Sequence, residues 1–179
     1  MRAAVEEHSR TLGQGGVLSR STYLRRSTDN QCATADRTDL TLHLQRVLRA
    51  PRERVFAAFV EPAQLAEWWG PMGFTALSVE LDVREGGWYR ITMQPPDGEA
   101  FHLRGQYLEV DPQQRLVYTF EYEQPDPDDQ ETLVTLSFFD HPDGTRLDFE
   151  QGSFTTQARC QLHETGWSET LDRLAEYLA

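Results

Sequence analysis

Residues 156–178 read TQARCQLHETGWSETLDRLAEYL, and this stretch decides the fold. Its apolar residues recur at spacings of three, four and seven, the period of an amphipathic α-helix. They are Cys160, Trp167, Leu171, Leu174 and Leu178. We therefore predict a long C-terminal helix that buries one face against the preceding part of the chain.

The chain before this helix alternates apolar and polar residues, which is typical of half-buried strands. The first run begins at Leu40. Six further runs follow, over residues 77–83, 89–93, 101–107, 116–122, 134–138 and 147–149. The links between these runs are short and contain Pro, Asp or Gly, which favours an antiparallel meander.

Two short helices interrupt the series of strands. Residues 52–60 follow Pro51, a residue that suits the first turn of a helix. Residues 63–69 form the second helix, which Gly70-Pro71 ends. The predicted fold is α+β: a curved antiparallel sheet of seven strands, wrapped around the long C-terminal helix, with two short helices after the first strand.

The length, charge and composition of the chain exclude several classes of function. The chain has 179 residues and a formal net charge of −12, so it repels the phosphates of a nucleic acid. Two cysteines are too few for a disulfide framework or a cysteine-rich zinc module. No apolar stretch is long enough to span a membrane, and we expect a cytoplasmic protein.

The first 38 residues differ from the rest of the chain. They carry an excess of arginine, lack apolar periodicity and are rich in Ser, Thr, Gly and Gln. Such a segment buries too little apolar surface to offset its ordering entropy. We predict a disordered or poorly ordered extension over residues 1–38 and a ligand-binding domain over residues 39–179.

Several motifs of this domain occur in an order and spacing that resemble one known family. They are Val55-Phe56-Ala57-Ala58-Phe59, Trp68-Trp69-Gly70-Pro71, Asp82-Val83-Arg84-Glu85-Gly86-Gly87, Glu109-Val110-Asp111-Pro112, Arg115-Leu116-Val117-Tyr118-Thr119 and His163-x-x-Gly166-Trp167. The family comprises homologues of the activator of the ninety-kilodalton heat-shock-protein ATPase. It is a branch of the SRPBCC superfamily, with START lipid-transfer domains and polyketide cyclases.

This resemblance implies the helix-grip fold, with a cavity between sheet and long helix that takes an apolar or amphipathic ligand. It implies no shared reaction. The family's namesake co-chaperone has a large additional N-terminal domain, and 38 residues are too few to supply one. An apolar cavity is also the usual place for a small-molecule site.

The candidate ligand-binding residues are aromatic or apolar residues of the strands, together with Trp69 at the end of the second short helix and two residues of the long helix. A fully packed core is the alternative interpretation of the same side chains. The candidates are Trp69, Met93, Phe101, Tyr107, Tyr118, Phe120, Phe138, Phe149, His163 and Trp167.

No metal or cofactor is predicted. His163-Glu164 begins a zinc-protease pattern, but its second histidine is replaced by Trp167. The acidic cluster over residues 126–131 lacks the glycine of a calcium loop, so we expect a solvated hairpin tip. Arg90 and Arg104 alternate with the apolar residues of their strands, so we expect them to face solvent. The alternative is that a barrel-like sheet turns one of them inward, where it would bind a carboxylate or phosphate.

Three hypotheses for the function follow. The first is a domain that binds a small apolar or amphipathic molecule without catalysis. The second is a cavity enzyme of the cyclase or hydrolase type that uses His163, His102 or Tyr107 as an acid or base. The third is a module that contacts a chaperone through its acidic surface. The sequence leaves the ligand, catalysis and the oligomeric state open, a homodimer included.

Overall fold

The computed structural model describes residues 31–35 and 39–179. The helices are α2 (Arg52–Val60), α3 (Pro62–Trp68) and α4 (Gln157–Leu178). The strands are β1 (Gln31–Ala35), β2 (Asp39–Leu48), β3 (Thr75–Leu81), β4 (Trp88–Gln94), β5 (Phe101–Asp111), β6 (Arg115–Tyr122), β7 (Thr132–His141) and β8 (Gly144–Phe154). The order of elements over residues 39–179 confirms the predicted α+β fold.

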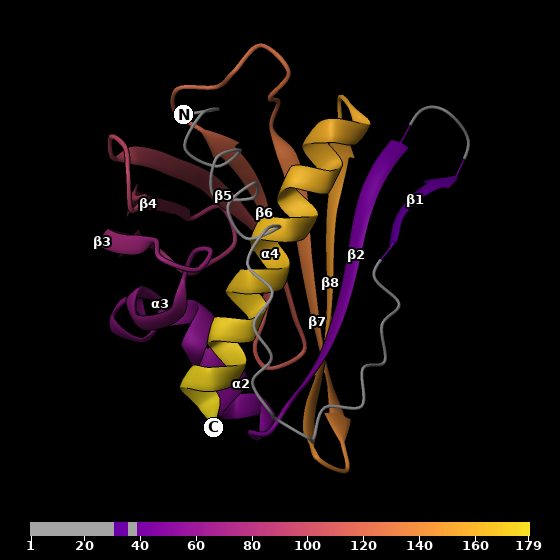
Figure 1. Ribbon diagram of the computed structural model, residues 1–179. Helices are drawn as coiled ribbons and strands as arrows, with labels where there is room; N and C mark the ends of the chain where they lie inside the picture. The colour runs from indigo at the N-terminus through magenta and orange to yellow at the C-terminus, as the bar shows by residue number, and fades with distance from the viewer. Residues whose placement is uncertain (1–30, 36–38) are drawn as a thin grey trace, which may run out of the picture.

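The strands form one antiparallel sheet in the order β1-β2-β8-β7-β6-β5-β4-β3. The sheet curves around α4, which crosses it diagonally, while α2 and α3 lie at one end (Figure 1). Breaks of register in β2, β3 and β5 contribute to the curvature, because a β-bulge bends its strand. This is the predicted arrangement of a curved sheet wrapped around a terminal helix.

The structure has one strand, β1, in addition to the seven that the sequence predicts. β1 pairs antiparallel with β2, with Cys32 opposite Leu42 and Ala35 opposite Asp39. It falls inside the segment predicted as an N-terminal extension, whose residues 1–30 and 36–38 lie outside the described part of the chain.

The core lies between α4 and the face of the sheet that it crosses. Cys160, Trp167, Leu171, Leu174 and Leu178 of α4 are all buried, as the helical period predicts. Thr156 caps the helix, since its hydroxyl accepts a hydrogen bond from the backbone N–H of Arg159. On the strands the buried residues alternate with exposed ones, which places one apolar face of the sheet against this helix.

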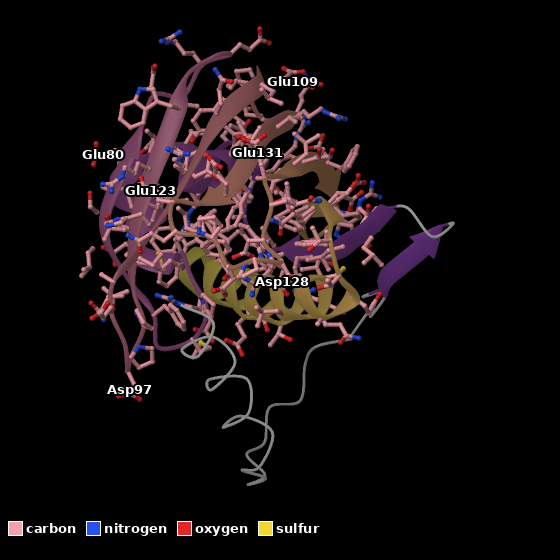
Figure 2. The ribbon with its side chains drawn as sticks, turned by 90° about the horizontal axis from the view of Figure 1, so that it is seen from above. Glu80, Asp97, Glu109, Glu123, Asp128 and Glu131 are labelled. Carbon is pink, nitrogen blue, oxygen red and sulfur yellow. The ribbon has the colours of Figure 1, made fainter. Side chains whose placement is uncertain are left out.

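The opposite face of the sheet carries many charged side chains, with exposed apolar ones such as Leu77, Trp88 and Leu108 among them. Glu80, Glu109 and Glu123 lie on the side away from α4 (Figure 2). Arg90 pairs with Glu123 at 2.5 Å, and Arg104 pairs with a neighbouring glutamate at 2.6 Å, so both arginines face outward as predicted. No helix in the described ranges is long and apolar enough to cross a bilayer.

Candidate functional site

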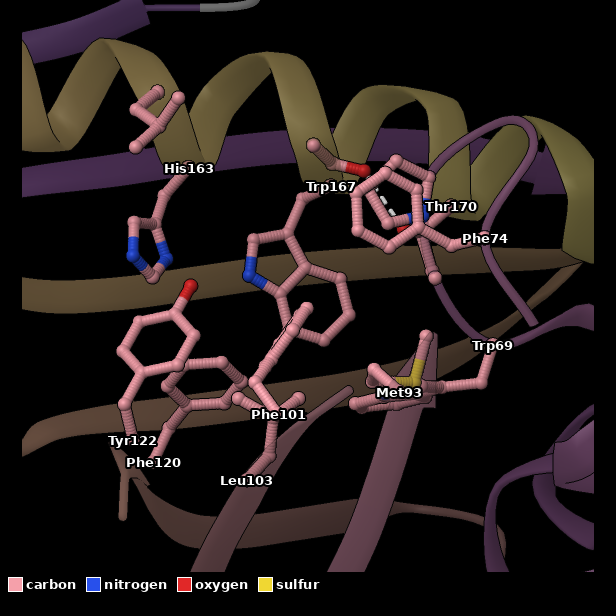
Figure 3. Close-up of a pocket in the computed structure, with 14 residues that line it drawn as sticks. Trp69, Phe74, Met93, Phe101, Leu103, Phe120, Tyr122, His163, Trp167 and Thr170 are labelled. Carbon is pink, nitrogen blue, oxygen red and sulfur yellow. Dashed lines mark hydrogen bonds between the residues drawn. The ribbon is translucent and has the colours of Figure 1, made fainter. Parts of the chain in front are cut away.

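A cavity of about 70 Å³ lies between α4, strands β4 to β6 and the loop that follows α3 (Figure 3). Half of its lining residues carry aromatic rings. The lining residues are Trp69, Gly70, Pro71, Phe74, Met93, Phe101, Leu103, Phe120, Tyr122, Leu162, His163, Gly166, Trp167 and Thr170. We refer to this cavity as the helix pocket.

Six of the ten candidate residues line the helix pocket. They are Trp69, Met93, Phe101, Phe120, His163 and Trp167. Trp69 and Trp167 meet edge to face across it, with ring centroids 5.1 Å apart. The neighbouring Trp68 points elsewhere: it is fully buried and donates its indole N–H to the carbonyl of Ala58 at 3.1 Å.

The other four candidates lie outside the helix pocket. Tyr107 and Tyr118 face a second, much smaller space of about 10 Å³ behind Trp69. Phe138 is packed in the core against α2, with ring centroids 5.6 Å from Phe56. Phe149 lies under Trp167 at 4.5 Å and supports the pocket wall from behind.

The structure adds lining residues that the candidate set lacks. Leu103 lies two residues beyond Phe101 on β5, and Thr170 lies three residues beyond Trp167 on α4, so the strand and helix periods place both on the pocket side. Tyr122 lies two residues beyond Phe120, so the strand period places it on the same apolar face. Phe74 belongs to a loop, and no periodicity indicates where a loop residue points.

The loop after α3 is held in place by Arg173 of α4. Its guanidinium donates to the carbonyl oxygens of Gly70 at 2.9 Å, Phe74 at 3.1 Å and Pro71 at 3.2 Å. It also reaches the carbonyl of Trp69, the residue that caps the C-terminus of α3, where a cation is favourable. This one side chain therefore fixes the loop that forms one wall of the helix pocket.

A buried amide organises the opposite end of the pocket. The side-chain oxygen of Gln151, which is fully buried on β8, accepts the indole N–H of Trp167 at 2.7 Å. The Nδ1 atom of His163 lies 3.1 Å from the same oxygen. The amide nitrogen of Gln151 donates to the hydroxyl of Thr132 at 2.8 Å. Three elements, β7, β8 and α4, are thus joined through one side chain.

This network defines the state of His163. An indole N–H can only donate, so the atom that it contacts is the amide oxygen, and Nδ1 must carry a proton to bond to that oxygen. Burial, with the nearby Arg159 as a second cause, lowers the pKa of His163 from 6.5 to about 3. The imidazole is therefore neutral at physiological pH and protonated on Nδ1.

The three aspartates between β6 and β7 are not part of the solvated hairpin tip that the sequence predicts, whereas Glu131 is exposed as expected. The side chain of Arg159, 7% exposed, pairs with Asp129 at 2.5 Å, Asp126 at 3.1 Å and Asp128 at 3.6 Å. The expectation was wrong because the cation comes from the first turn of α4, about 30 residues further along the chain. We refer to these four residues as the Arg159 cluster.

The helix pocket is an apolar cavity with polar groups at one end. His163 and Tyr122 are the ionisable residues that line it. Burial raises the pKa of Tyr122 far above its usual range, so its hydroxyl stays protonated. No group of three or more potential metal ligands occurs within residues 31–35 and 39–179.

A strongly curved antiparallel sheet around a long C-terminal helix, with a pocket between the two, is the helix-grip architecture. Residues 49–179 match the family described as Activator of Hsp90 ATPase homolog 1-like protein. The chain belongs to this family, which confirms the resemblance drawn from its motifs.

Solved structures support the assignment. A protein of Chromobacterium violaceum is 30% identical, with a TM-score of 0.69 over 77% of this chain and 96% of its own. A protein of Silicibacter pomeroyi named for the same family is 28% identical, with a TM-score of 0.66 over 77% and 96% of the two chains. A protein of Mycobacterium smegmatis is 25% identical, with a TM-score of 0.69 over 84% and 93%. No curated protein matches the chain.

Proposed function

We propose that this protein binds one small apolar or amphipathic molecule in the helix pocket and catalyses no reaction there. The observation that carries the proposal is a cavity of about 70 Å³ walled by aromatic rings, with a few polar groups gathered near His163. Apolar walls with a small number of placed polar groups are typical of small-molecule sites.

The size of the helix pocket indicates a small ligand. Its volume of about 70 Å³ is several times the ~10–15 Å³ that one water molecule requires. It is below the roughly 300 Å³ at which pockets for drug-sized molecules begin. Met93 contributes a flexible thioether to the wall and can yield to a slightly larger guest. Molecules with one ring are therefore the first size class to test.

The states of the ionisable groups favour binding over acid–base catalysis. His163 has one ring nitrogen committed to Gln151 and a pKa of about 3, which is far from that of an effective base at neutral pH. The two other candidate acid–base residues lie elsewhere. His102 lies between two buried residues of β5, so its side chain is on the other face of the sheet, where it contacts Thr92 at 3.1 Å. Tyr107 faces the smaller space behind Trp69.

Two tryptophans in the wall provide the test. We expect one-ring probes such as toluene to change the fluorescence of Trp69 and Trp167 and to raise the melting temperature of the protein. The stabilisation grows with ligand concentration, by about 2.7 kcal/mol at a concentration of 100 Kd. Shifts no larger than those of an unrelated protein of similar size would contradict the proposal.

A matched pair of variants assigns the binding to the helix pocket. A Cβ atom on Gly166 would meet only Pro71, at 3.6 Å, so a side chain can be added there toward the pocket wall. We expect Gly166→Leu to fill part of the helix pocket and abolish the probe response. Thr165→Leu places the same side chain on the exposed neighbouring position of α4 and should leave the response unchanged. Equal responses of the two variants would contradict binding in this pocket.

A further inference from the structure

The polar end of the helix pocket has one hydroxyl that is free to bind a ligand. Among the described residues, none forms a hydrogen bond with the hydroxyl of Tyr122, which points toward the ring of His163 (Figure 3). The hydroxyl of Thr170, by contrast, already donates to the carbonyl of Gly166 at 2.7 Å. A ligand atom can therefore donate to Tyr122 or accept from it.

No positive charge is available at this end. His163 is neutral, because burial disfavours the imidazolium. Arg159 lies one helical turn before His163, but its guanidinium is already engaged by three carboxylates. The Arg159 cluster carries three acids and one base, a net charge of −2 when all are ionised.

The remaining arginines near the pocket are also engaged. Arg173 donates to four backbone carbonyl oxygens of the loop after α3. Arg90 and Arg104 pair with glutamates on the outer face of the sheet. A carboxylate or phosphate bound beside Tyr122 would lose its hydration and gain no cation at that end of the helix pocket, and an unpaired buried charge is strongly disfavoured.

We propose that the helix pocket selects an uncharged one-ring molecule with a single hydroxyl or carbonyl group, held by Tyr122, and rejects the corresponding anion. This inference rests on the proposed function and deepens it. It divides amphipathic ligands into two classes: neutral alcohols, phenols and carbonyl compounds bind, whereas carboxylates of the same shape do not.

Three probes of similar shape test the inference: benzyl alcohol, toluene and benzoate, each titrated at neutral pH with tryptophan fluorescence as the readout. We count as pocket binding only the response that Gly166→Leu abolishes. Benzyl alcohol should bind about three- to tenfold more tightly than toluene, the usual gain from one hydrogen bond. Benzoate should bind at least tenfold more weakly than toluene.

A second pair of variants tests the role of Tyr122. Tyr122→Phe should remove the advantage of benzyl alcohol over toluene and leave the affinity for toluene unchanged. Tyr118→Phe is the matched control, because the hydroxyl of Tyr118 likewise has no hydrogen-bond partner, although it is buried, and Tyr118 lies outside the helix pocket. That variant should preserve the preference of the wild type.

The outcomes separate this inference from the proposed function. If toluene and benzoate bind equally well, the charge selection is wrong while the binding function stands. If Tyr122→Phe weakens both neutral probes equally, or leaves the preference for the alcohol intact, the role of Tyr122 is wrong. If none of the three probes binds, both the inference and the proposed function fail.

Discussion

At the scale of single residues, Gln151 is the side chain on which the polar end of the pocket depends. Its amide oxygen accepts from Trp167 at 2.7 Å and lies 3.1 Å from Nδ1 of His163, and its amide nitrogen donates to Thr132. Because Gln151 is fully buried, water cannot replace any of these bonds. The orientation of two pocket residues therefore follows from one glutamine on β8.

We expect Gln151→Met to destabilise the protein by about 2–4 kcal/mol, because it leaves the N–H groups of Trp167 and His163 without an acceptor. Urea unfolding measures the change. Gln45→Met is the control: Gln45 also bonds across the sheet, to Asp148 at 2.8 Å, but it is exposed, so its loss should cost less than about 0.5 kcal/mol. Equal losses in the two variants would show that burial of the amide does not matter.

Burial of His163 also predicts how stability depends on pH. Above pH 6.5 the residue is neutral in both the folded and the unfolded state. Between pH 6.5 and about 3 the unfolded state binds a proton that the folded state does not bind, so stability falls as the pH falls. The contribution reaches about 1.4 kcal/mol per pH unit within that range.

The variant His163→Gln should therefore lose less stability than the wild type on acidification, with the difference confined to the acidic range. Denaturant unfolding at several pH values measures both curves. Above pH 7 the two curves should run parallel, which is the internal control. Parallel curves down to pH 4 would mean that His163 takes up its proton without unfolding.

At the scale of elements, local periodicity predicts most of the fold. The alternation along β4, β5, β7 and β8 and the 3.6-residue period of α4 match the buried faces of the structure. These signals succeed because each element buries one face only. Periodicity predicts which face of the sheet a side chain lies on, but not where along that face it lies. Tyr107 and Phe138 therefore share the buried face with Phe101 but lie outside the helix pocket.

Local periodicity does not predict contacts between elements that are far apart in the sequence. The three aspartates between β6 and β7 resemble a solvated turn in the sequence, and the cation that they surround belongs to α4. The hydrogen bonds of Arg173 to the loop after α3 join residues about 100 apart in the chain. Neither pairing has a local signal, because both depend on how the sheet curves around the helix.

The loop after α3 gives a prediction at this scale. Arg173→Met should destabilise the protein by roughly 1–3 kcal/mol and speed proteolytic cleavage near Gly73, because several backbone carbonyls lose a charged donor. Limited proteolysis followed by mass spectrometry locates the cut. Arg46→Met is the control. Arg46 of β2 pairs at 3.2 Å with Asp172, which lies on α4 beside Arg173 and is largely exposed. Loss of this exposed ion pair should destabilise the protein by less than about 1 kcal/mol. Cleavage at the same rate in both variants would argue against this role of Arg173.

At the scale of the whole molecule, charge is unbalanced. The chain has 29 acidic residues against 17 arginines and no lysine, a net charge of −12. Glu80 and Glu109 lie on the outer face of the sheet (Figure 2). Glu109 pairs with Arg115 at 3.2 Å, but the excess of acids over arginines leaves a net repulsion between carboxylates at the surface.

Salt should therefore stabilise the protein. We expect the melting temperature to rise between about 10 mM and about 200 mM sodium chloride, because screening weakens the net repulsion between exposed carboxylates. Sucrose at matched osmolality is the control for effects other than ionic strength. A melting temperature that falls over this range would mean that the ion pairs outweigh the repulsion.

The position of α4 in the chain has a consequence during synthesis. The ribosome makes β2 to β8 before the helix that covers them, so the apolar concave face of the sheet lacks this cover until α4 has emerged. Uncovered surfaces of this kind are prone to aggregate or to recruit a holding factor. A nascent chain stalled just short of α4 should thus be the form of this protein most in need of cellular protection.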